Sequence, residues 1–66
     1  MSQARLTVAE AAWFFGVRPA TVRTWVRRYQ LVAAGKRGNA HVYPFAELAS
    51  AERRARLYHN APRFRD

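Results

Sequence analysis

The sequence contains no cysteine and only four acidic residues among 66. Without cysteine the chain can form neither a disulfide nor a thiolate zinc site, the usual supports of very small domains. A folded chain of this length buries only about 60% of the surface that its unfolded form exposes. We therefore expect one small domain of modest stability, because the length leaves no room for a second.

The chain also lacks a long hydrophobic run. No stretch approaches the roughly 20 apolar residues that cross a bilayer, and the N-terminus has no apolar segment of the signal-peptide kind. We expect a cytoplasmic protein, bacterial or in a phage-infected host, with no membrane partner. Hydrophobic residues nevertheless make up 50% of the sequence and aromatic residues 14%, which is too much for a disordered basic tail.

Positive charge is abundant where negative charge is scarce. The chain has 12 Lys and Arg residues and a formal net charge of +8. Each such cation can replace a counterion condensed on phosphate, so a polyanion, usually nucleic acid, is the expected partner. The alternative is a surface charge that serves only solubility.

A first helix is predicted from Thr7 to Gly16. Thr7 and Glu10 have capping-box spacing, in which the Thr hydroxyl accepts a hydrogen bond from a backbone amide and the Glu reaches back to the amide of the cap. Gly16 suits the left-handed turn that ends a helix. The apolar residues between them recur at the i, i+3, i+4, i+7 spacing of one helix face: Val8, Ala11, Ala12 and Phe15.

A second helix is predicted from Pro19 to Gln30, because proline is favoured at the first helical position. Its apolar stripe consists of Val22, Trp25, Val26 and Tyr29. The other faces carry Arg23, Thr24, Arg27 and Arg28. Two short helices joined by a tight turn that contains glycine, the second with an exposed basic face, are typical of a helix-turn-helix.

The chain after the second helix predicts a β-hairpin and a third helix. Apolar runs at residues 31–34 and 40–43 flank the cationic, glycine-rich segment 35–39, which we interpret as the tip of the hairpin. Pro44 opens the third helix, whose inward residues are Phe45, Leu48, Ala49 and Ala55. The predicted fold class is mainly α with a small β-hairpin, a winged helix-turn-helix. Residues 1–58 form its single domain and residues 59–66 a basic flexible tail.

These elements carry a family resemblance. The stretch "LTVAEAAWFFGVRPATVRTWVRRYQL", the glycine-rich hairpin and "YPFAEL" resemble the winged helix-turn-helix of the MerR and phage-excisionase superfamily, especially the short excisionases of actinobacteria and phages. The likeness covers roughly residues 5–57. Its specific part is the combination of "TVAEAA", the "GV-x-PATVR-x-W" turn and helix, and the wing that ends in Tyr43.

The resemblance implies how DNA would be bound. The second helix would enter the major groove with Thr21, Arg23 and Thr24 on its leading face. Arg27 and Arg28 match positions that usually meet phosphates. Lys36, Arg37 and Asn39 match a wing that lies along the backbone or the neighbouring minor groove, and Trp25 and Tyr43 match core aromatics. Several copies would bind adjacent direct repeats cooperatively, bend the DNA and help an integrase to run excision.

The sequence departs from the family at three places. Arg18 stands where relatives commonly have a Ser or Thr cap, which loses a cap worth about 1 kcal/mol and offers a phosphate contact instead. His41 stands where an Arg is usual, so that contact should be weaker and pH-dependent. Full MerR regulators continue into a dimerising helix and an effector domain, whereas this sequence ends at Asp66.

Individual cations keep more than one interpretation. Arg23 is the best candidate for reading base edges, although a phosphate contact is as consistent with its position. Arg27 and Arg28 lie toward the far end of the helix, which favours phosphate contacts. The cations late in the third helix either add to the electrostatic footprint on DNA or form a solvated helix end: Arg53, Arg54 and Arg56.

Trp13 and Phe14 lie off the apolar stripe of the first helix, and two explanations stay open. They cover a flank of the fold itself, Phe14 on the third helix and Trp13 under the tail, or they contact a neighbouring copy of the chain on DNA. In the first case the residues covering them are Phe45, Leu48, Tyr58 and Phe64.

Other function classes are disfavoured. His41 and His59 are too isolated for a metal site, and we expect no cofactor. We expect no enzyme, because Glu10 is engaged in capping, and Glu47 and Glu52 fall on different helix faces. Two alternatives to the excisionase remain: a minimal MerR-like transcriptional regulator and a phage protein-interaction adaptor. An adaptor would not need cations on both the second helix and the wing.

Overall fold

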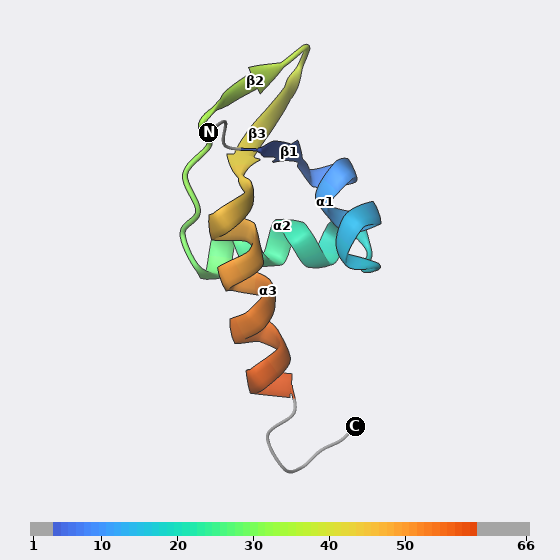
Figure 1. Ribbon diagram of the computed structural model, residues 1–66, viewed down its shortest axis with the longest axis vertical. Coiled ribbons are helices and arrows are strands. Elements are labelled where there is room, and N and C mark those ends of the chain that lie inside the picture. The colour runs from blue at the N-terminus through green and yellow to red at the C-terminus, as the bar shows by residue number, and fades with distance from the viewer. Residues whose placement is uncertain (1–3, 60–66) are drawn as a thin grey trace.

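The computed structural model describes residues 4–59, whose arrangement is shown in Figure 1. The elements follow in the order β1 (Arg5–Thr7), α1 (Val8–Phe15), α2 (Pro19–Arg28), β2 (Gly35–Arg37), β3 (Ala40–Pro44) and α3 (Phe45–His59). The β2–β3 hairpin extends from one end of the helices, and α3 runs from it in the opposite direction (Figure 1). The winged helix-turn-helix predicted from the sequence is confirmed.

The predicted caps of α1 are present. The hydroxyl of Thr7 accepts a hydrogen bond from the Glu10 amide at 3.1 Å, and the Thr7 amide donates to Glu10 Oε1 at 2.9 Å. At the other end Gly16 adopts φ 71°, and its amide donates to the Ala12 and Trp13 carbonyls. The left-handed conformation is one that glycine adopts without steric cost, so the chain turns directly into α2.

Helix α2 is shorter than predicted. It begins at Pro19, with no side-chain cap from Arg18, but its last residue is Arg28. The expected end, Gln30, adopts φ 55°, outside the helix. The Leu31 amide then donates to the Val26 carbonyl at 3.0 Å, the bond that closes a Schellman-type helix end. The sequence gave no local signal for this helix end, because the residue in the left-handed conformation is Gln30 and not a glycine.

The first strand and the tip of the hairpin were predicted at the wrong residues. Residues 31–34 form no strand, and Gly35–Arg37, expected at the tip, form β2. The tip is the two-residue turn of Gly38 and Asn39, where Gly38 supplies φ 64°. A Gly-Asn pair is a preferred two-residue hairpin turn because it tolerates positive φ, and this local preference sets the register.

A third strand, β1, was not predicted. It pairs antiparallel with β3, so that the sheet has the order β1-β3-β2. Leu6 lies opposite Tyr43 in this ladder, and both side chains belong to or pack against the core. β3 is therefore the central strand, which joins the wing to the body of the domain.

The core lies where the three helices meet the base of β3. Leu48 and Val22 are its largest fully buried side chains, and the expected core aromatics Trp25 and Tyr43 are buried with them. Small residues let the helix backbones approach closely around these larger side chains. The buried alanines are Ala11, Ala12, Ala51 and Ala55; of these, Ala51 was not predicted, and Ala49, which was, is only half-buried.

Phe14 and Trp13 differ in their surroundings. The Phe14 ring meets the Phe45 ring edge-on at a centroid distance of 5.3 Å, which is the contact with the third helix that one explanation predicted. Phe15 stacks on Phe45 and meets Trp25 edge-on. Trp13 is 86% exposed.

Helix α3 extends into the predicted C-terminal tail. α3 includes His59, the first residue of the predicted tail, and residues 60–66 lie outside the described part of the chain. The suggested cover of Trp13 by Tyr58 and Phe64 also falls on side chains outside the description. Within the described residues, no helix is both long and apolar enough to span a membrane.

Candidate nucleic-acid interface

The basic face of α2 follows from the burial of its apolar stripe. Val22 and Trp25 point into the core and are 0% and 5% exposed. Arg23 and Arg27 are four residues apart, so they lie on the same side of the helix, and both are exposed. The Thr24 hydroxyl donates to the Ala20 carbonyl at 3.0 Å. The Thr24 hydroxyl hydrogen is thus used within the helix, and the hydroxyl oxygen can still accept a hydrogen bond from DNA.

An open hollow lies between α2, the base of the wing and the first turn of α1. Arg23 and Arg27 border it from α2, and His41 borders it from β3. Its apolar lining residues come from α1, α2 and β3: Val8, Ala9, Pro19, Val26, Ala40 and Tyr43. Three predicted DNA-contacting residues that are up to 18 positions apart in the sequence thus surround one concave surface. Sequence reasoning missed the contribution of α1, because no local pattern indicates which surface the start of a helix borders.

The two faces of the wing carry different residues. Side chains alternate between faces along a strand, and directly opposed residues share a face. Lys36 lies opposite His41, and His41 shares its face with Tyr43, two residues on. Lys36 and His41 therefore lie on the strand face of Tyr43, while Arg37 lies on the other face with Ala40, which also borders the edge of the hollow.

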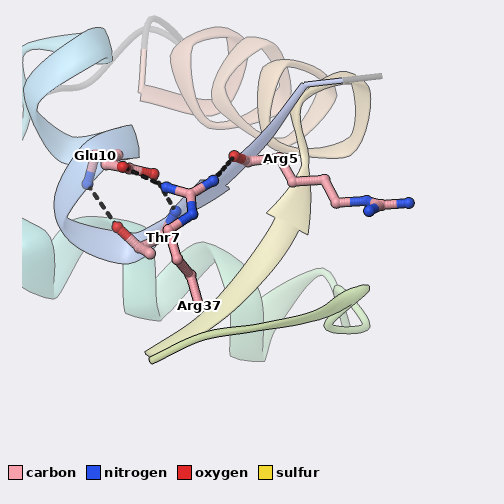
Figure 2. A network of polar contacts seen from close by, with 4 residues as sticks. All are labelled: Arg5, Thr7, Glu10 and Arg37. Atoms are coloured by element: carbon pink, nitrogen blue, oxygen red, sulfur yellow. Dashed lines mark hydrogen bonds and ion pairs between the residues drawn. The ribbon is translucent and has the colours of Figure 1, made fainter. Parts of the chain in front are cut away.

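Arg37 takes part in a polar network (Figure 2). Its Nη1 forms an ion pair with Glu10 Oε2, and its Nη2 donates to the Arg5 carbonyl at 2.9 Å. The Arg5 side chain itself is directed away from the network (Figure 2). The hydrogen bond from the Thr7 amide, followed by that from Arg37, lowers the pKa of Glu10 below its ordinary value of 4.5.

The remaining predicted residues are spread around this surface. Thr21 and Arg28 are seven positions apart and lie on the flank of α2 that faces away from the hollow. Arg18 is exposed just before α2, and Asn39 is exposed in the turn of the wing. The structure therefore groups the predicted residues into a hollow-side set and an opposite flank, with Thr24 between them.

The late cations of α3 have partners inside the molecule. Arg56 binds Glu52 through two hydrogen bonds of 3.1 and 2.7 Å, which lowers the pKa of Glu52 and raises that of Arg56. The Arg54 guanidinium lies over the Tyr29 ring at 5.4 Å from its centroid. Arg54 and Arg56 are thus engaged with partners inside the domain.

The fold and this surface define the class of protein. A family model described as a helix-turn-helix domain matches residues 5–55, most of the chain. The chain belongs to this family of excisionase-like and MerR-like helix-turn-helix domains, which bind DNA and are typically not enzymes. No curated protein and no solved structure is significantly similar to it.

The Glu10 network predicts a dependence of stability on pH. Because folding lowers the pKa of Glu10, its stabilising contribution is present above the ordinary pKa and is lost as the pH falls through the lowered value. We expect Glu10→Gln to have a lower urea midpoint than the wild type near neutral pH. Gln retains the capping-box geometry, and the difference should shrink as the pH falls below 4.5 and through the lowered pKa of Glu10. Glu47→Gln controls for net charge. A difference between wild type and Glu10→Gln that is constant with pH would contradict the assignment.

Proposed function

We propose that the chain binds duplex DNA in a sequence-directed manner, with α2 in the major groove and the β2–β3 wing beside it. The observation that supports this is the shared hollow: Arg23 and Arg27 of α2 and the imidazole of His41 in β3 border one concave surface, and Lys36 lies on the same face of the wing as His41. A helix and an adjacent hairpin that present cations to one side suit a groove and its flanking phosphates.

The proposed roles follow the positions on α2. Arg23, on the hollow side of the first two turns, is the candidate for base edges in the major groove. Thr21 and Thr24 flank it. Arg27 and Arg28, in the last turn, are proposed phosphate contacts, one on each side of the helix. Lys36, Asn39 and His41 extend the contacts along the wing, and Arg18 offers one at the start of α2.

A single module of this size buries only about 600–1,000 Å² of protein surface on DNA, which is small for tight specific binding. Cooperative binding of neighbouring copies to direct repeats would supply the rest, as excisionases do. Trp13 and Phe14 are exposed by 86% and 57% beside a shallow apolar hollow on α1. We propose this patch as the contact between copies, Phe14 serving also as packing for Phe45.

The proposed biological role is that of an excisionase, which bends the DNA of an attachment site and assists an integrase. A minimal MerR-like regulator would use the same DNA-binding surface at promoter repeats, so the sites and not the module separate the two roles. Protection of an attachment site in a footprint supports the first role, and protection of promoter repeats alone supports the second. The adaptor is disfavoured because cations occur on both α2 and the wing.

Replacing Arg23 and Lys36 should have different effects. Arg23→Ala should cost about 1–3 kcal/mol on the preferred site and relax the preference for that sequence. Lys36→Ala should weaken binding about equally for all duplexes, because phosphates carry no sequence information. Competition binding with a selected site and scrambled duplexes measures both. Equal losses on preferred and scrambled duplexes for Arg23→Ala would overturn its role as a base reader.

Trp13→Ala should leave binding to a single site unchanged and reduce the cooperativity on DNA with two adjacent sites. The side chain is exposed, so its removal should have little effect on the fold. Leu57→Ala removes another exposed apolar side chain, on α3, and is the matched control. Unchanged cooperativity for Trp13→Ala in a quantitative gel-shift titration would refute the proposed contact.

A further inference from the structure

Arg37 joins three segments that are distant in the sequence. It is the last residue of β2, and its guanidinium meets Glu10 in the first turn of α1 and the backbone of Arg5 in β1. These partners are 27 and 32 positions away. Its contacts therefore link the wing to the elements against which the wing must be oriented (Figure 2).

The guanidinium is directed away from the face of Lys36. Lys36 and His41 share the strand face of Tyr43, and the alternation of the strand places Arg37 on the other face, where its guanidinium is bound by Glu10 and the Arg5 carbonyl. β3 lies between β2 and β1 in the sheet, so the contact of Arg37 with the Arg5 carbonyl requires its side chain to cross β3. Through this crossing Arg37 reaches α1 and β1.

We propose that Arg37 is a positioning residue that fixes the orientation of the wing, and that it is not one of the DNA phosphate contacts. The inference rests on the proposed function, because it presupposes that the wing meets DNA through the face of Lys36. The resemblance had placed Lys36 and Arg37 together as backbone contacts. The geometry assigns the binding role to one and the supporting role to the other.

The wing needs such support because little else holds β2. All three residues of β2 are exposed, and it is an edge strand paired with β3 alone. A loosely held hairpin loses conformational freedom when DNA orders it, and this loss lowers the affinity. Arginine suits the task because its planar guanidinium can donate to a carboxylate and a carbonyl at once, which a lysine ammonium does less well.

Salt titrations of DNA binding separate positioning from phosphate contact. Each phosphate contact adds about −0.9 to the slope of log K against log salt concentration. Lys36→Ala should make the slope less steep by about that amount. Arg37→Ala should lower the affinity about three- to fivefold at every salt concentration and leave the slope unchanged. Arg37→Lys, which keeps the charge but not the geometry, should resemble Arg37→Ala.

Amide hydrogen exchange supplies the second readout. In Arg37→Ala the β2 amides should exchange faster, while those of α2 and α3 remain protected, which shows that the domain is folded and only the wing is loosened. A slope reduced as in Lys36→Ala, with full recovery in Arg37→Lys, would overturn the inference and leave the proposed function intact. Unchanged affinity and β2 exchange in Arg37→Ala would also overturn it. If Lys36→Ala as well as Arg37→Ala left DNA binding unchanged, the proposed role of the wing would fail.

Discussion

The burial of Val22 and Trp25 on one side of α2 is the constraint on which the arrangement depends. Once this stripe faces the core, the helical repeat turns Arg23 and Arg27 outward on the flank next to the wing. Trp25 holds the stripe in place through its edge-on contact with Phe15. The alanines of α1 and α3 allow the helices to approach α2 closely enough to bury it. Core packing thus sets the direction of the basic face.

The sheet connects the wing to the core and so fixes its position relative to α2. β3 is paired on both sides, with β1 toward the body and β2 toward the tip, so the wing is continuous with a strand anchored by Tyr43 in the core. The alternation along these strands divides the wing between two tasks. Lys36 and His41 lie with the cations of α2, whereas Arg37 and its partner Glu10 hold the hairpin against the start of α1.

The helices could be predicted because their signals are local, whereas contacts between distant residues could not be predicted. The Thr7 and Glu10 cap, the Gly16 turn and the apolar stripe of α2 are each encoded within a few residues, and each was confirmed. The first strand of the wing was predicted at the wrong residues, because Gly35–Arg37 belong to a glycine-rich cationic segment that was interpreted as a turn and instead form a strand. The three residues of β1 are too few to show an alternating pattern. The partners of Arg37 lie too far along the chain for any local motif to indicate them.

The central proposal is that α2 and one face of the wing form a single cationic surface for DNA. The most direct test is the salt dependence of wild-type binding to duplex DNA, measured by fluorescence anisotropy. The account predicts a slope of log K against log salt concentration of roughly −4 to −5, and a slope near zero would contradict it. The expected contributions come from the cations of α2, from the residue just before it and from Lys36 on the wing: Arg18, Arg23, Arg27, Arg28 and Lys36.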